Sequence, residues 1–242
     1  MVTQTDKSAA GATPLQAAPE LGVADLRLLQ LLSPTIPTGA FNFSQGLEWA
    51  VHAGWVSTEE DFQRWLLEQL QGLMVQQELP LLATLHAASV RQAPDELLRW
   101  ANWAVALRDT SELRTEEVDR AGALLRVLEA LGVPGLESVA SALEKSQLAG
   151  IAWAAARWSL PLNSLLRAYA YSWLEQQIAA GVKLIPLGQS QGQRLLFSLA
   201  NSIPDSVVSA LTVEVDEIGY SSPAISLASC SHETQYTRLY RS

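Results

Sequence analysis

Helical periodicity runs through almost the whole chain from residue 22 onward, and strand patterns are nearly absent from it. The clearest example begins at Thr58, a favourable N-cap, followed by acidic residues at 59–61 that suit a helix N-terminus. Apolar residues then recur every three or four positions up to Met74, which predicts one buried stripe. Only the run at 212–220 resembles a strand, so the sequence predicts an all-α fold.

The same periodicity predicts the remaining helices. In one of them the apolar stripe passes through Val118, Ala121, Leu125 and Leu128, and the glutamates of these helices are interpreted as solvated. Typical helix lengths give a single compact bundle of about nine or ten helices. Further helices are predicted over 80–90, 95–107, 112–132, 142–158, 161–184, 189–201 and 204–217, and a helical face through 223–242.

The composition fits a chain with a large core. Of the 242 residues 48% are hydrophobic and 17% are charged, which implies extensive burial inside the fold or against partners. The sequence divides into an N-terminal tail over 1–21, expected to be flexible, a helical domain over 22–222 and a C-terminal docking tail over 223–242.

Charge and cysteine usage argue against several classes of protein. The formal net charge of −9 argues against nucleic acid and anionic membranes as partners. Cys230 is the only cysteine, which excludes an internal disulfide and suits a reducing compartment. The N-terminus does not resemble a secretory signal and no apolar run is long enough to span a bilayer, so we expect a cytoplasmic protein.

Residues 188–192 read Gly-Gln-Ser-Gln-Gly, the pattern around the nucleophile of many serine hydrolases. Asp205 or Asp216 and then His232 follow in the hydrolase order, so one alternative is an enzyme that uses Ser190. That nucleophile needs a strand before it and a sheet beneath it, and the chain offers no strands to build the sheet. The favoured interpretation is a turn between two helices and no enzymatic activity.

One short stretch combines metal-binding residue types. Cys230 and His232, with Glu233 beside them, could hold a soft or borderline metal ion transiently. Two good ligands do not close a site, and the other histidines belong to no recognisable ligand set. We therefore expect no resident metal or cofactor.

Three segments are unusual for a purely structural bundle. Residues 33–56 contain prolines and glycines that give a rigid, irregular connection into a short helix. Residues 182–196 form a sharp turn between helices. Residues 231–242 contain two Tyr and two Arg, residue types that anchor interfaces, so they are interpreted as a docking element. The alternative is a tail packed on its own domain.

At these places the sequence resembles the urease accessory protein F (UreF) family. The matching stretches are PTGAFNFSQGLE at 37–48, SELR at 111–114, KLIPLGQ at 183–189 and HETQYTRLYRS at 232–242, in order and at fitting distances. Lys183 stands where the family is expected to have Arg; it keeps the charge but lacks the planar fork of a bidentate donor.

The resemblance implies an all-α, usually dimeric protein without catalytic activity of its own. Such a protein bridges the urease accessory protein called D or H and the GTPase accessory protein G. The assembly acts on apo-urease so that nickel, with a carbamylated lysine, is placed in its active site; nickel passes through the complex as cargo. The matching positions carry over as partner contacts: Pro37, Gly39, Ser44, Glu48, Lys183, Gly188, Gln189, His232, Glu233, Tyr236, Arg238 and Leu239.

Two hypotheses refine this expectation. Residues 232–242 would be loose in the free protein and become ordered on the D or H partner. Lys183 or Arg194, near the turn, would gate the nucleotide cycle of the GTPase. The competing classes are the hydrolase that uses Ser190 and a helical scaffold unrelated to nickel.

Overall fold

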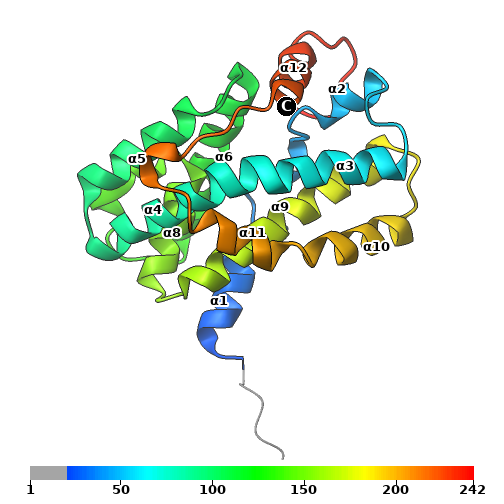
Figure 1. Ribbon diagram of the computed structural model, residues 1–242. Coiled ribbons are helices and arrows are strands. Elements are labelled where there is room, and N and C mark those ends of the chain that lie inside the picture. The colour runs from blue at the N-terminus through cyan, green and yellow to red at the C-terminus, as the bar shows by residue number, and fades with distance from the viewer. Residues whose placement is uncertain (1–20) are drawn as a thin grey trace, which may run out of the picture.

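The computed structural model describes residues 21–242, and helices make up most of that range (Figure 1). None of these described residues lies in a strand, which confirms the predicted all-α class. They form twelve α-helices, more than the nine or ten expected, because several helices have only one or two turns. The flexible tail predicted for 1–21 lies outside the described residues, apart from Leu21.

The elements follow one another along the chain with short connections. The first half contains α1 (Val23–Leu31), η1 (Ala40–Asn42), α2 (Leu47–His52), α3 (Glu59–Gln69), the π-helical η2 (Leu70–Glu78), α4 (Leu79–Arg91), α5 (Pro94–Ala106) and α6 (Ser111–Ala130). The second half contains η3 (Leu136–Val139), α7 (Ala140–Leu143), α8 (Gln147–Arg157), α9 (Leu162–Leu184), α10 (Gln189–Ala200), α11 (Ile203–Ala210), η4 (Val215–Glu217) and α12 (Pro223–His232).

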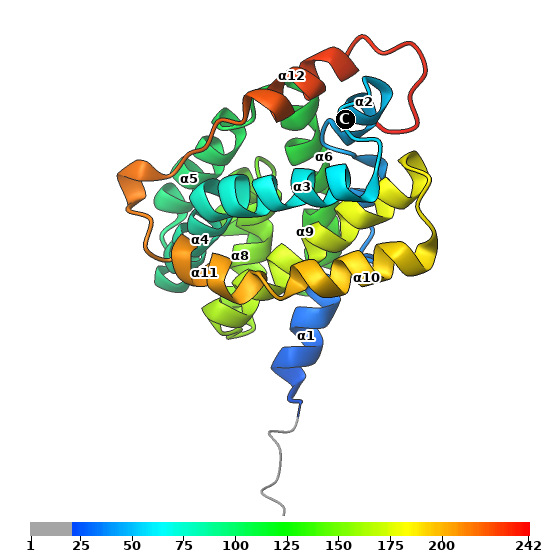
Figure 2. The same ribbon diagram turned by 45° about the vertical axis from the view of Figure 1, so that its right-hand side comes forward.

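Helix α9, the longest at 23 residues, organises the bundle. It contacts α1, α2, α3, α4, α10 and α11, while α8 packs against both α4 and α6. Helix α12 lies beside α2, at the end of the molecule opposite to α1 in both views (Figures 1 and 2). The buried apolar side chains of these helices form one continuous core. The two chain segments with the most distinctive sequence, around α2 and around α12, thus meet at one end.

Helix α3, η2 and α4 form one continuous helical rod, where the sequence predicted two helices with a new start at Pro80. Pro80 has no N–H to donate along the helix, which frees the carbonyl of Gln76 four residues earlier. That carbonyl accepts the N–H of Gly219 at 3.0 Å, and Gln77 Oε1 accepts the N–H of Tyr220 at 3.2 Å. The proline therefore creates an attachment point for the segment that precedes α12.

The helix predicted over 142–158 is wrong at its start. Helix α7 ends at Leu143, and α8 begins only after Ser146. The Ser146 hydroxyl accepts the N–H of Leu148 at 3.1 Å and donates to the buried Glu117 carboxylate at 2.6 Å. An N-cap with a buried acidic partner therefore interrupts what the apolar pattern presented as one helix.

Two predictions near the C-terminus also differ from the structure. The helix predicted over 204–217 ends at Ala210, and the strand-like run 212–220 forms turns and η4 instead. Helix α12 ends at His232, so the helical face expected through 223–242 does not extend to Tyr236 and Leu239, which are exposed. After His232 the chain leaves its helical path and turns back toward α2 (Figure 2).

The crossing of α9 over α3 depends on Gly181. A Cβ atom at this position would overlap the ring of Phe62, which is fully buried in α3. The absent side chain lets the two helices approach closely.

Replacing Gly181 with Ala should destabilise the protein by about 1–3 kcal/mol, because the Phe62 ring and α3 must shift to admit the methyl group. Gly122→Ala is the matched control, since a Cβ there meets only the end of the Arg126 side chain in α6. Urea unfolding measures both variants, and an unchanged midpoint for Gly181→Ala would contradict the packing described here.

Candidate functional site

The turn between η1 and α2 contains two consecutive residues in the left-handed region. Gln45 has a φ of 54° and Gly46 a φ of 83°, a conformation that glycine adopts freely and that costs glutamine energy. A Cβ at Gly46 would also press on the backbone N of Ser229 in α12, at 3.1 Å. The turn sends the side chain of Ser44 toward the C-terminal segment and that of Gln45 toward α6 and α9.

Residues around this turn hold the last part of the chain. We call Asn42, Ser44 and Glu48 the tail clamp, and residues 233–242 the tail. The N–H and the hydroxyl of Ser44 both donate to the main-chain oxygen of Ser242, at 2.7 and 2.6 Å. Both bonds are buried, since Ser44 and Ser242 have no exposed surface.

The other two clamp residues bind the tail in the same way. The Glu48 carboxylate accepts the N–H of Leu239 at 2.7 Å and the N–H of Tyr240 at 2.9 Å. The carbonyl of Asn42 accepts the N–H of Arg241 at 2.7 Å. These bonds all end on main-chain atoms, so the clamp fixes the tail backbone and leaves its side chains to point elsewhere.

His232, at the end of α12, lies fully buried between two carboxylates. Its Nδ1 is 2.7 Å from a Glu112 oxygen in α6, and its Nε2 is 3.2 Å from a Glu48 oxygen in α2. Arg238 of the tail donates to the second Glu112 oxygen at 2.7 Å. The imidazole thus joins α12 to α2 and α6, and Glu112 extends this network to the tail.

The SELR stretch at 111–114 lies against the start of the tail. Both the N–H and the hydroxyl of Ser111 donate to the Glu233 carboxylate, at 3.1 and 2.6 Å. The hydrogen bond from the Ser111 side chain lowers the pKa of Glu233 below its ordinary value. Glu112, the next residue of this stretch, contacts His232 of α12 and Arg238 of the tail. Two neighbouring residues of the stretch therefore bind α12 and the tail.

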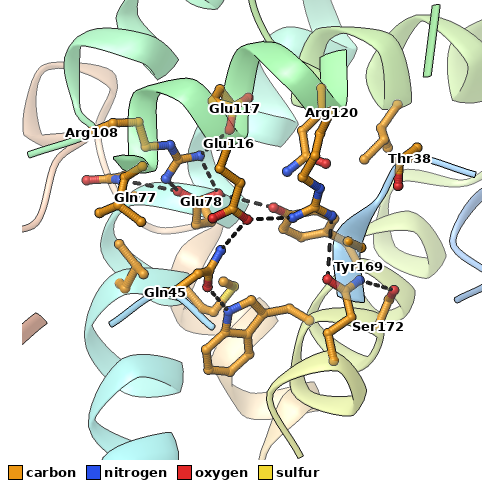
Figure 3. Close-up of a pocket in the computed structure, with 18 of the residues that line it drawn as sticks. Thr38, Gln45, Gln77, Glu78, Arg108, Glu116, Glu117, Arg120, Tyr169 and Ser172 are labelled. Atoms are coloured by element: carbon orange, nitrogen blue, oxygen red, sulfur yellow. Dashed lines mark hydrogen bonds and ion pairs between the residues drawn. The ribbon is translucent and has the colours of Figure 1, made fainter. Parts of the chain in front are cut away.

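Beneath the clamp, Glu116 connects the tail to the interior. Figure 3 shows its carboxylate facing Gln45 and Arg120. It accepts the Ser242 hydroxyl at 3.0 Å, the Gln45 amide at 3.0 Å and the Arg120 guanidinium at 2.9 Å. The Gln45 oxygen in turn accepts the indole N–H of Trp173 in α9 at 3.1 Å. These contacts retain Gln45 in its strained backbone conformation.

A second group of buried charges lines the same internal pocket (Figure 3). Arg108 pairs with Glu78, and with Glu117 at 2.9 Å, and the Tyr169 hydroxyl donates to Glu78 at 3.1 Å. Burial by itself raises the pKa of Glu78, but the adjacent Arg108 outweighs burial and lowers that pKa below its ordinary value. Burial, with the Glu78 charge nearby, raises the pKa of Tyr169 well above its ordinary value. The charged side chains of Glu78, Arg108 and Glu117 in this pocket are therefore paired with one another.

Comparison with protein families and curated proteins gives a clear result. The family model described as UreF matches residues 56–200 of the chain. A protein of Alcanivorax borkumensis named urease accessory protein UreF is 46% identical to it over 225 residues, which cover 90% of this chain and 98% of the relative.

The chain belongs to the UreF family. UreF relatives of Pseudomonas putida strain W619 and Citrobacter koseri are 44% and 41% identical over 220 and 217 residues. Those alignments cover 91% and 90% of this chain and 98% and 97% of the relatives, so the similarity extends over nearly the whole UreF sequence.

In this UreF chain the predicted contact residues separate into two groups. Ser44, Glu48 and His232 are buried and bind within the chain, so in this structure they present no surface to a partner. The hypothesis of a loose tail also differs from the structure, in which the clamp binds the tail of the isolated chain. The others are exposed: Pro37, Gly39, Lys183, Gly188, Gln189, Glu233, Tyr236, Arg238 and Leu239.

The exposed positions of UreF do not all lie together. The Lys183 ammonium is 5.8 Å from the ring centroid of Tyr240, which joins the end of α9 to the tail. Gly188 caps α10 and Gln189 opens it. Pro37 lines a separate groove with Leu131 and Trp158. The structure thus brings Lys183 to the tail but places Pro37 elsewhere.

The structure does not provide the setting that the serine hydrolase alternative requires. Ser190 lies exposed in the first turn of α10, and no strand precedes it in the part of the chain that the structure describes. His232, the supposed base, is buried between Glu48 and Glu112. Gly188 is the N-cap of α10, at the turn between helices that the favoured interpretation expected, whereas Gly192 lies within α10 and packs against α9.

The structure gives the transient metal hypothesis no support. Both ring nitrogens of His232 face carboxylates, whereas Cys230 is exposed and Glu233 binds Ser111. Over residues 21–242 no group of three or more His, Cys, Asp or Glu side chains could hold a metal ion. Within the same range no helix is both long and apolar enough to cross a bilayer.

Sequence reasoning missed the charged inner face of α6. Its glutamates were interpreted as solvated and Val118 as buried, but Val118 is 41% exposed while Glu116 and Glu117 are 3% and 2% exposed. The pair Glu116 and Arg120, four residues apart, was an available signal. That spacing is equally common on exposed helix faces, so it does not by itself indicate burial.

Replacing Glu78 with Gln should lower the stability of UreF by about 3 kcal/mol at neutral pH, because Arg108 loses one of its two buried partners. The folded pKa of Glu78 lies below its unfolded value, so its contribution is present above that value and is lost as the pH falls. The curves of variant and wild type should therefore converge as the pH falls through the folded pKa of Glu78.

Urea unfolding as a function of pH measures this difference. Glu129→Gln, at an exposed position of α6, is the matched control and should stay within about 0.5 kcal/mol of wild type. A constant gap between Glu78→Gln and wild type across the pH range would show that the lost charge is not responsible.

Proposed function

We propose that this chain is a urease accessory protein that assembles a nickel centre by holding other proteins together, without catalysis of its own. It bridges the D or H accessory protein and the GTPase accessory protein G, works as a homodimer in the cytoplasm, and presents nickel as cargo to apo-urease. The names and near-complete coverage of the curated relatives support this function. The family resemblance of the tail supports the choice of partners.

The observation that carries the proposal is the contrast between tail backbone and tail side chains. The clamp binds main-chain atoms, yet Tyr236 is 102% exposed, Leu239 72%, and the Arg238 side chain 40%. A backbone fixed before binding lowers the entropy that association costs, and Tyr and Arg are the residues that most often anchor interfaces. The tail therefore suits docking to the D or H protein as an already ordered element.

Because the tail is bound to the clamp, deletion of residues 232–242 is not a suitable test of docking. Removing residues 232–242 would take His232 away from between Glu48 and Glu112 and leave two buried carboxylates without their partners. A loss of partner binding could then result from destabilisation of the fold and not from loss of the docking surface. Substitution of the exposed side chains alone avoids this problem.

The double variant Tyr236→Ala/Leu239→Ala should keep the helical circular dichroism and unfolding midpoint of wild type. Its affinity for the D or H protein should fall at least about 30-fold, the loss expected for an anchor residue worth about 2 kcal/mol. Co-purification and calorimetric titration measure the loss, with Phe197→Ala as control, because Phe197 is 79% exposed on α10, outside the tail.

Retained affinity in the double variant would remove the tail from the D or H interface. Failure of the wild-type chain to bind either the D or H protein or the G protein would favour the helical scaffold unrelated to nickel.

Lys183 supports a second part of the proposal, control of the GTPase. It lies at the end of α9, and its ammonium faces the Tyr240 ring of the tail, while Arg194 is exposed on α10. A cation beside the docking tail is suitably placed to influence a GTPase held in the same assembly.

Lys183→Ala should therefore change the GTP turnover of the G protein within the assembly, while Lys183→Arg, which keeps the charge, should not. Single-turnover hydrolysis in the reconstituted complex measures both rates, and Arg194→Ala tests the neighbouring cation. Equal turnover in wild type and Lys183→Ala would exclude a role for Lys183 in the nucleotide cycle.

A further inference from the structure

A second pocket lies between the end of α4, the start of α5, η3 and the end of α8. Its walls include Pro94, Pro134, Ser138, Val139, Trp153 and Arg157. Its volume of about 410 Å³ is within the range of small-molecule sites in proteins. Helices α4, α5 and α8 lie on the side of the bundle away from α2 in both views, so this pocket is separate from the tail clamp (Figures 1 and 2).

Arg157, the last residue of α8, is the only charged residue in the wall of this pocket. It is partly buried, yet it forms no ion pair with any of residues 21–242. Arg108 and Arg120, the other two arginines of that range that are not exposed, both pair with buried glutamates. A charge removed from water without a counter-ion costs free energy, which an anion bound in the pocket would recover.

The guanidinium of Arg157 is held in place by the protein itself. It lies 4.6 Å from the centroid of the Trp153 ring, and its Nη2 donates to the carbonyl oxygen of Ser89 at 2.9 Å. Trp153 is fixed in turn, because its indole N–H donates to the carbonyl oxygen of Pro134 at 3.1 Å. Nη1 forms no hydrogen bond with the described part of the chain. Its two N–H groups are therefore available to a ligand, on a side chain that loses little freedom on binding.

Acidic side chains close in sequence do not neutralise this pocket. Asp95 and Glu137 are exposed and form no part of its wall. Glu96 pairs instead with Arg91, at 2.7 Å. The pocket therefore carries a single positive charge.

The rest of the wall discriminates between anions. Pro94, Pro134 and Val139 give it apolar surface beside the guanidinium. A monoanion with an apolar body matches one guanidinium and an apolar wall, whereas a phosphate dianion would keep a charge without a partner.

We propose that this pocket binds a small organic monocarboxylate. The carboxylate accepts the N–H groups of Arg157 Nη1, and the apolar body of the ligand lies against Pro94 and Pro134. The site is additional to the proposed assembly function and does not depend on the partners named for it.

Titration of the full-length chain with benzoate tests the site, with benzamide as the matched neutral ligand. Benzoate should shift the indole N–H resonance of Trp153 in a saturable manner, because this ring lies against Arg157 in the pocket wall. Benzamide has the same shape without the charge and should bind at least about 10-fold more weakly, since the charge-assisted hydrogen bond is lost. Inorganic phosphate should also bind at least about 10-fold more weakly than benzoate. Nuclear magnetic resonance at constant ionic strength measures all three affinities.

Two variants assign the binding to this pocket. Arg157→Gln removes the charge and should weaken benzoate binding at least about 10-fold. Ser138→Phe keeps Arg157 but places a ring in the pocket, and should abolish saturable binding. Arg126→Gln is the matched control, because Arg126 is exposed on α6, and it should leave the affinity unchanged.

A benzoate titration of wild type without saturation would overturn the proposal. Equal affinity for benzoate and benzamide, phosphate binding as tight as benzoate binding, or unchanged affinity in Arg157→Gln would overturn it as well. Loss of affinity in Arg126→Gln would also overturn it, by showing that the overall charge of the chain controls binding. Because Ser138→Phe retains the contact of Arg157 with Trp153, unchanged benzoate binding in this variant would place the ligand outside the pocket.

Discussion

The burial of a charged helix face is the constraint on which the arrangement of this protein depends. Helix α6 directs Glu112, Glu116, Glu117 and Arg120 inward, and a buried charge is tolerated only when it is paired and hydrogen-bonded. Each of these side chains brings in a different part of the chain. Glu112 binds α12 and the tail, Glu116 binds the turn before α2, and Glu117 binds the cap of α8 and the connection after α5.

This arrangement explains why short stretches that lie far apart in the sequence form one site. The tail clamp and the SELR stretch bind the residues that follow α12 through polar groups. In each contact a donor of one segment meets an acceptor of another. Hydrophobic burial holds α9, α8 and α4 together without strict direction. The charged contacts are directional, and they set which end of the bundle receives the chain terminus.

The helices could be predicted from sequence because their apolar side chains repeat with the period of an α-helix. The buried charges could not, since Glu116 and Arg120 have the same spacing that a solvated ion pair has. The helix start predicted at residue 80 agrees with the beginning of α4, but a proline in a first helical turn and a proline within a continuous rod give the same local signal. The role of the tail could not be decided from sequence, because its composition fits both a docking element and a segment packed on its own domain. The hydrogen bonds that hold it are made by main-chain N–H groups, which every residue except proline has, so the pattern of side chains does not indicate them.

Because the clamp recognises peptide groups, the identity of most tail side chains has little influence on whether the tail is seated. Substitution of Tyr236 or Leu239 should therefore leave the tail bound to the clamp, provided that the backbone path is kept. If the surface of the partner protein changes, the exposed tail side chains could change with it, one residue at a time. The fold thus separates the side chains that grip the tail backbone, Ser44 and Glu48, from the tail side chains that are free to co-evolve.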